Sequence, residues 1–247
     1  MLLEMSMGAS VMIVMGIIIR TFFSNHLPKF TFILIWGLVI IRLLVPISIS
    51  MPNFLGQHQL EIPSQELIVD RIQVITDTDI RNVPIPIDFT VIEDEFTIEW
   101  LPLIWKSGIL IGGGLFLSSH LKFRKQVADS LPVSYEFKKN IEIRETTKIS
   151  SPLTYGIFRP VILMPKTMDW DKEEQVEAVL THEYVHICSR DYLAKIVLAI
   201  VLCVHWFNPL VWVMYVLANR DIELACDEKV LKILGREKRS VYAMTLL

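Results

Sequence analysis

The sequence predicts an α+β membrane protein, in which three N-terminal transmembrane helices precede a cytoplasmic domain with a small sheet and a membrane-dipping helical hairpin. The first observation is composition: of 247 residues, 52% are apolar, which is high for a soluble protein. The second is position, because three long apolar windows lie before residue 125. The third is a later change to short strand-like and helical patterns that carry charged side chains.

Three apolar windows, at residues 5–23, 30–47 and 101–121, are predicted spans within a transmembrane region that covers residues 1–125. About 20 apolar residues cross a hydrocarbon layer of about 30 Å. The first window has no basic segment before it and no clear cleavage site, so we interpret it as a retained span and not as a signal peptide.

Charge predicts the orientation of these spans. Residues 49–99 contain ten acidic and two basic residues, whereas Lys122, Arg124 and Lys125 follow the third window directly. Lysine and arginine mark the cytoplasmic side, so we expect residues 49–99 to form an external acidic loop and residues 126–247 to lie in the cytoplasm. A solvated connector is the simpler interpretation of the loop, and contact with an external ligand is the alternative.

Short strands are predicted at the start of the cytoplasmic domain. Residues 141–145 alternate apolar and polar side chains, and residues 161–164 form an apolar run that ends at Pro165. The segment between them, residues 151–160, contains prolines that cannot donate to a central ladder. It is therefore predicted to be an edge strand or an extended loop.

The central motif is His182-Glu183-Tyr184-Val185-His186. Four residues of a helix turn through about 400°, so His182 and His186 project from one face and can hold a single ion. Glu183 beside them completes a two-histidine zinc signature, in which the glutamate acts as the catalytic base. The plain alternative is an ordinary helix, in which these polar residues would be awkward neighbours of Val185 and Ile187.

A catalytic zinc ion needs a third protein ligand, and Glu223 is the best candidate. Asp227 shares its helical face and can orient a ligating histidine as a supporting residue. The alternative is a solvated, charged helix surface. Cys226 lies between them, and we interpret it as a buried thiol rather than a ligand.

The apolar stretch between the two motifs constrains the topology. A single crossing would leave Glu223 on the opposite side of the membrane from His186. Because Asn208-Pro209 interrupts the stretch, we predict a re-entrant hairpin over residues 192–219 that dips in from the cytoplasmic side, with Asp191 capping its first arm.

A substrate could bind by strand addition along Thr154, Tyr155, Gly156 and Ile157. For stabilisation of the oxyanion, Tyr155 and Arg220 are both candidates, and the sequence does not select between them.

The sequence resembles the BlaR/MecR family of bacterial signal-transducing membrane metalloproteases. The resemblance rests on residues 151–165, the histidine motif followed by Arg190-Asp191, the turn at residues 206–209, and residues 223–227. It implies a gluzincin-type site with His182, His186 and Glu223 as zinc ligands. In that family an external domain binds a β-lactam, and the activated protease cleaves itself and leads to removal of a transcriptional repressor.

The resemblance places the chain in a bacterial cell membrane, multi-pass, with the protease site facing the cytoplasm. The expected partners are the lipid bilayer and a protein or peptide substrate, either the chain itself or a cytoplasmic repressor. No direct contact with nucleic acid is expected, and a homodimer stays open. The 247 residues show no fourth span and no external penicillin-binding domain, so β-lactam sensing is not assigned to them.

Two alternatives are retained. The first is a constitutive membrane zinc protease of the quality-control or prenyl-peptide type, which shares the motif and the spans. The second is a non-enzymatic membrane receptor or scaffold with a vestigial metal site. Glu183 argues against the second, because a purely structural site has no need of a base.

Overall fold

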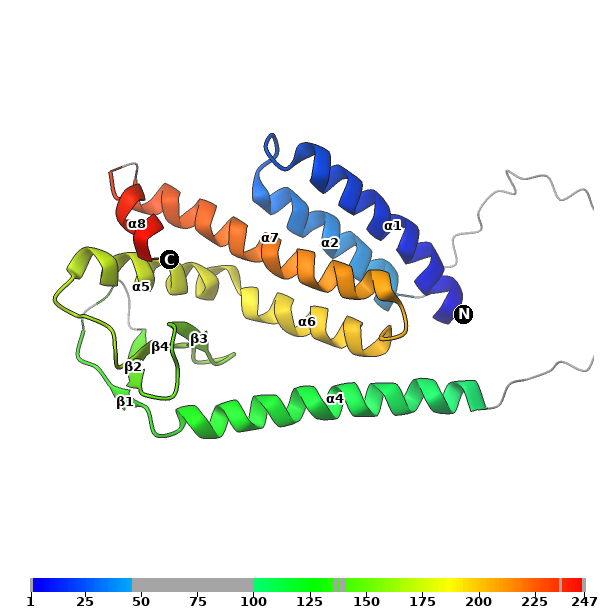
Figure 1. The fold of residues 1–247 in the computed structure, drawn as a ribbon, viewed down its shortest axis with the longest axis horizontal. Helices are drawn as coiled ribbons and strands as arrows, with labels where there is room; N and C mark the ends of the chain where they lie inside the picture. Colours follow the sequence, from blue (N-terminus) through cyan, green and yellow to red (C-terminus); the bar gives the residue numbers. More distant parts are fainter. Residues whose placement is uncertain (1, 46–99, 136, 138–140, 236, 246–247) are drawn as a thin grey trace, which may run out of the picture. The chain divides into compact units, whose positions relative to one another are not determined.

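The computed structural model describes residues 2–45, 100–135, 137, 141–235 and 237–245. These residues are mostly helical and include one small mixed sheet (Figure 1). The chain divides into two units, and all of the described residues belong to the first, which comprises residues 1–46 and 100–247. The predicted external loop, residues 49–99, lies outside the described residues.

Four helices pack together through apolar side chains: α1 (Leu2–Phe23), α2 (Lys29–Leu44), α6 (Asp191–Val204) and α7 (Pro209–Leu234). Their common core contains Ile13, Trp36, Val201 and Met214, all buried. The same helices also carry large apolar side chains on their outer faces, such as Leu34 at 58% exposure. Helices that are apolar all round suit a lipid environment better than water.

Helices α6 and α7 form a hairpin joined by a short turn at residues 205–208, and its entry into the membrane from the cytoplasmic side stays a prediction. Asn208 caps α7 by accepting a hydrogen bond from the backbone N–H of Leu210 at 2.9 Å, and Pro209 occupies the first helical position. The second arm does not end at residue 219 as predicted. Helix α7 continues unbroken to Leu234, because the charged residues that follow the apolar stretch are good helix formers.

The hairpin turn lies beside the ends of three other helices. Asn208 donates a hydrogen bond to Ser6 Oγ, near the start of α1, at 2.7 Å. His205 Nε2 lies 3.1 Å from the carbonyl oxygen of Leu43, near the end of α2. Helix α4 (Trp100–Val127) begins here as well, and the indole of Trp105 donates to the carbonyl of Val204 at 2.9 Å.

Two described helices are long and apolar enough to cross a membrane, over Glu4–Phe23 and Trp100–Val127. They correspond to the first and third predicted spans. The second predicted span, residues 30–47, overlaps α2, which has 16 residues and falls short of the roughly 20 that a crossing needs. Its crossing of the membrane therefore stays a prediction.

The sheet has the strand order β1-β2-β4-β3. Its strands are β1 (Leu131–Pro132), β2 (Glu142–Thr146), β3 (Leu153–Tyr155) and β4 (Val161–Pro165). Strands β2 and β4 pair in parallel, whereas β3 pairs antiparallel to β4. The two strands predicted at residues 141–145 and 161–164 are present within one residue, and β3 lies at an edge, as the neighbouring prolines indicated.

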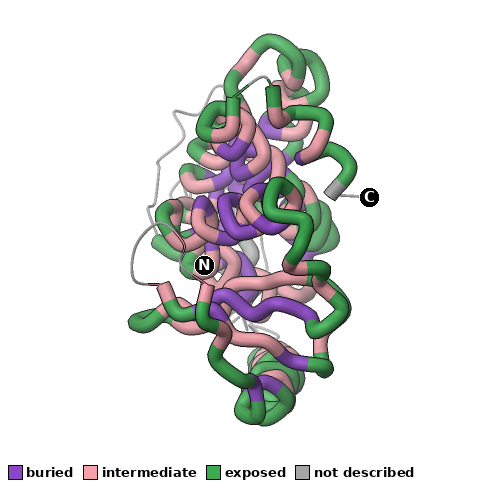
Figure 2. Tube along the Cα trace, turned by 90° about the vertical axis from the view of Figure 1, so that its left-hand side faces the viewer, coloured by how far each residue is buried: buried purple, intermediate pink, exposed green. Residues whose placement is uncertain are grey.

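Helix α5 (Glu173–Ser189) lies between the sheet and the C-terminal helices, and it carries the histidine motif. One face packs Val176 and Leu180 against Ile162 and Met164 of β4. The opposite face meets α7 and α8 (Arg239–Thr245) through a second buried cluster: Ala178, Val185, Cys226, Val230 and Tyr242. Figure 2 shows that the buried residues gather in the interior and the exposed residues on the outside. The motif is therefore fixed from both sides.

Candidate metal centre

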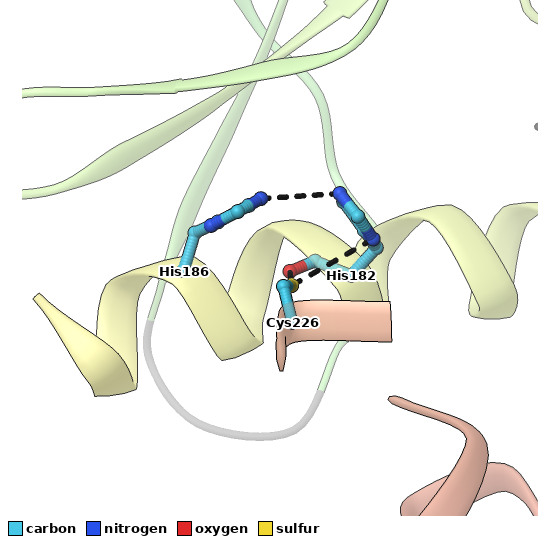
Figure 3. Close-up of side chains that lie close together, drawn as sticks. All are labelled: His182, His186 and Cys226. Atoms are coloured by element: carbon cyan, nitrogen blue, oxygen red, sulfur yellow. Dashed lines mark hydrogen bonds between the residues drawn. The ribbon is translucent and has the colours of Figure 1, made fainter. Parts of the chain in front are cut away.

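His182 and His186 stand one helical turn apart on α5, as predicted. Their Nε2 atoms are 3.1 Å apart, and their ring planes are nearly perpendicular, at 82°. Figure 3 shows the two rings turned toward each other above the helix. Two imidazole nitrogens at this separation can bind one cation together.

Glu223 of α7 completes a triangle with these nitrogens. Its Oε2 atom lies 3.3 Å from His186 Nε2 and 3.8 Å from His182 Nε2. A tetrahedral ion with bonds of about 2.0–2.1 Å separates neighbouring ligand atoms by about 3.3 Å. The three donor atoms therefore lie near three corners of such a tetrahedron.

Cys226 offers an alternative third donor, because its Sγ lies within 4.8 Å of donor atoms on both histidines. The sulfur is 3.7 Å from Nδ1 of His182, and it donates to the His182 carbonyl oxygen at 3.5 Å (Figure 3). Nδ1 is the nitrogen that faces away from His186. A cation held between the two Nε2 atoms would thus meet Glu223 and not Cys226, which is buried among apolar neighbours.

Tyr242 of α8 holds the ring of His182. Its hydroxyl lies 2.7 Å from His182 Nδ1 and donates to Asp227 Oδ1 at 2.5 Å. Because the hydroxyl donates its only proton to Asp227, it accepts a hydrogen bond from the Nδ1–H of His182. The Nε2 atom of His182 then keeps a lone pair that can bind a metal. We expected Asp227 to contact the histidine directly. Asp227 Oδ1 is 3.4 Å from His182 Nδ1, and Tyr242 bridges the two.

Asp191 holds the other ring. Its Oδ2 atom lies 2.7 Å from His186 Nδ1. We predicted this residue as a helix cap, which is wrong, because α6 has no side-chain cap and Arg190 occupies the capping position. Arg190 adopts a left-handed conformation, with φ of 55°, that turns the chain sharply between α5 and α6. The turn brings Asp191 back toward the histidine that lies five residues before it.

The charges around the centre favour a cation. Burial lowers the pKa of His182, but the carboxylate of Asp227 and the side chain of Cys226 outweigh it and raise the pKa to about 9. Burial also opposes protonation of His186, yet Asp191, Cys226 and Glu223 raise its pKa to about 12. The pKa of Glu223 falls to about 2, mainly through its contact with His186. A divalent cation would take the place of these protons.

A cleft of about 720 Å³ opens in front of the histidines. Glu183 is 7% exposed, and the Thr154 hydroxyl of β3 donates to its Oε2 at 2.8 Å. Lys195 of α6 donates to Glu223 Oε1 at 2.7 Å. The cleft is lined by strand β3 and its following turn, by α5, and by the first turns of α6: Leu153, Thr154, Gly156, Ile157, Phe158, His182, Glu183, His186, Tyr192, Leu193, Lys195 and Glu223 among others.

Of the four residues predicted to bind substrate, Thr154, Gly156 and Ile157 line this cleft. Tyr155 does not, because alternate side chains of a strand point to opposite faces. Its ring packs instead on His120 and Phe123 of α4, at centroid distances of 6.3 and 5.5 Å. Arg220, the other oxyanion candidate, is exposed on α7 and is not among the lining residues.

Sequence reasoning missed three contributors to the centre. Tyr242 lies near the end of the sequence and belongs to no motif. Lys195 lies in the apolar stretch after the motif, and no spacing rule connects it with Glu223. Asp191 carried the one available signal, since a carboxylate shortly after a histidine ligand can reach back to that ring across a tight turn.

A histidine pair with an adjacent glutamate on one helix, supported by carboxylates from a second helix, is a centre of the metallopeptidase type. The chain belongs to the BlaR1 peptidase M56 family, whose pattern matches residues 1–247. The resemblance inferred from the motifs is thus confirmed.

Curated relatives agree with this assignment. The chain is similar to regulatory protein BlaR1 of Bacillus licheniformis, with 33% identity over 111 residues, which is 45% of this chain and 18% of that protein. It is also similar to the methicillin resistance mecR1 protein of Staphylococcus aureus strain Mu50, with 29% identity over 131 residues, which is 53% of this chain and 22% of that protein. The matched segments thus span about a fifth of these relatives.

Proposed function

We propose that this chain is an integral-membrane zinc metalloendopeptidase that hydrolyses peptide bonds on the cytoplasmic side of a bacterial membrane. The observation that carries the proposal is the triangle of donor atoms from His182, His186 and Glu223, with Glu183 directly beside it. Family membership supports a peptidase, and the names of the relatives refer to regulation and to methicillin resistance. Signal-regulated cleavage of itself or of a transcriptional repressor is the matching role.

Zinc suits this donor set, because two imidazoles and one carboxylate with an open fourth position are typical of catalytic zinc. His182 and His186 would bind through Nε2, and Glu223 through Oε2. A bound zinc ion would supply Lewis-acid polarisation of a water molecule and of the scissile carbonyl. Tyr242, Asp227 and Asp191 keep the two rings in the required tautomer and orientation.

Glu183 carries the proton transfers. Its carboxylate takes a proton from the attacking water and returns it to the leaving amine. The hydrogen bond from Thr154 occupies Oε2 and leaves Oε1 for the water. Because Thr154 belongs to β3, the strand that borders the cleft also aims the catalytic base.

Strand β3 offers a surface for an extended peptide. It lies at the edge of the sheet and pairs with β4 on one side only among the described strands. A substrate segment could add as a further strand and place its carbonyl in the cleft beside Thr154. This arrangement suits an unfolded segment of the chain itself or of a repressor, and it involves no nucleic acid.

The deciding experiment compares Glu183→Ala with the wild type in detergent or bilayer. We expect the variant to keep its zinc content but to lose at least about 100-fold in peptide hydrolysis, since a general base contributes about that much. Glu174→Ala, an exposed residue in the first turn of the same helix, serves as the control and should retain cleavage. Persistent hydrolysis in Glu183→Ala would contradict the mechanism, and absence of zinc from the wild type would contradict the site.

A further inference from the structure

The turn between β3 and β4, Gly156–Pro160, presents two apolar side chains to the outside. Phe158 is 94% exposed and Ile157 is 50% exposed. The turn is tight: Gly156 has φ of 101°, and a Cβ atom there would lie 2.5 Å from the Arg159 carbonyl oxygen. Glycine is therefore required, and the backbone holds both apolar side chains outward in a defined position.

The depth of this turn relative to the membrane follows from Tyr155, its neighbour in β3. Tyr155 packs on His120 and Phe123 of α4. At that point the apolar run of α4 gives way to Lys122, Arg124 and Lys125. A long apolar helix that ends in a cluster of basic residues leaves the hydrocarbon layer there. The turn at Gly156–Pro160 thus begins one residue beyond a side chain located at the membrane boundary.

The other wall of the cleft has a similar composition. The first turns of α6 contribute Leu193, 41% exposed, and Lys195. Helix α6 then continues as an apolar helix with Ile200 half exposed. Apolar side chains beside basic side chains are typical of a surface that meets phospholipid head groups.

We propose that the Gly156–Pro160 turn inserts Phe158 and Ile157 into the cytoplasmic face of the phospholipid bilayer, so that the metal cleft opens along the membrane surface. The proposal rests on the proposed function for its membrane orientation and extends it to a substrate class, namely segments held close to the membrane. Phe158 stands at the rim of the cleft, and its 94% exposure leaves the side chain free to contact a surface outside the cleft. The adjacent basic residues favour an anionic lipid surface over a peptide as that partner.

The test measures the depth of a spin label at residue 158 in single-copy nanodiscs of phosphatidylcholine and phosphatidylglycerol. The labelled protein is Phe158→Cys, with Cys188→Ser and Cys203→Ala to remove the accessible native thiols. The matched control is Leu131→Cys on β1, because Leu131 is also apolar and exposed, at 68%, and lies on the opposite edge of the sheet.

We expect the label at residue 158 to collide more with oxygen, which is lipid-soluble, than with an aqueous nickel chelate, and the label at residue 131 to show the reverse. Equal access of the chelate to both labels would overturn the proposal. Shielding of residue 158 only after an extended peptide is added would overturn it too, and would make the turn a peptide subsite. The measurement is repeated in Glu183→Ala, so its outcome does not depend on whether the chain is a protease.

Discussion

The guanidinium of Arg20 on α1 donates to both carboxylate oxygens of Asp221 on α7, at 2.9 and 3.0 Å. Trp36 of α2 donates to the same carboxylate at 2.8 Å, and Asp221 is only 1% exposed. Because Asp221 lies two residues before Glu223, the two side chains point to nearly opposite faces of α7. The ion pair therefore sets the rotation at which α7 presents Glu223 to the histidines.

Replacing one member of this buried pair is expected to destabilise the protein strongly. In Asp221→Asn the partly buried charge of Arg20 loses its counter-charge, so we expect a loss of about 3 kcal/mol in the free energy of unfolding. Chemical unfolding in detergent micelles measures it. Asp171→Asn, an exposed carboxylate before α5, should change stability by less than about 0.5 kcal/mol. Equal losses in the two variants would contradict the role of the pair.

Tyr242→Phe tests the bridge between His182 and Asp227. The variant keeps the ring, which is buried against α5, but removes the hydroxyl that fixes the imidazole. Zinc affinity, measured by competition with a chelator, should fall by about 10-fold or more. Tyr135→Phe alters a tyrosine that packs on Trp170 in the sheet core and should leave zinc affinity unchanged. Wild-type affinity in Tyr242→Phe would show that the bridge does not orient the ligand.

Thr154→Val tests whether β3 aims the catalytic base. The isosteric change removes the hydrogen bond to Glu183 while keeping the β-branched shape that suits a strand. We expect kcat to fall about 10-fold with zinc retained, whereas Thr154→Ser should restore most of it, because proton transfer depends on a positioned carboxylate. If valine and serine variants hydrolyse peptide equally well, the base is oriented by another contact.

Thiol labelling tests the path of the hairpin. Cys188 is exposed and lies two residues after His186, so it reports on that side of the membrane without any substitution. A membrane-impermeant maleimide added to intact cells should reach neither Cys188 nor a label near Glu223. At Pro209→Cys, protection would support the predicted re-entrant hairpin, and labelling would show that the turn reaches the outer face. The turn lies beside the start of α1 and the start of α4, the two ends assigned to the outside. External labelling of Cys188 would invert the topology.

The features that could be predicted from the sequence are those that depend on local periodicity. The apolar windows, the strands beside Val161 and the one-turn spacing of His182 and His186 depend on neighbours along the chain. The hairpin is predicted because Glu223 has to lie on the same side of the membrane as the two histidines.

The parts that sequence could not supply depend on contacts between distant segments. Tyr242 reaches His182 only because α8 folds back over α5, and no spacing rule encodes that. Asp191 reaches His186 through a left-handed Arg190, a conformation that arginine rarely adopts and that sequence does not announce. Tyr155 faces α4 instead of the cleft because alternate side chains of a strand point to opposite faces, and the sequence does not show which face of β3 meets the cleft.

The hairpin also determines when the centre can form during synthesis. The two histidines precede α6 and α7 in the chain, whereas Glu223 and Tyr242 follow the turn at Asn208. A growing chain therefore carries an incomplete ligand set until both arms have left the ribosome and packed against α1 and α2. The proposed peptidase site is therefore complete only after α7 and α8 have packed on α5.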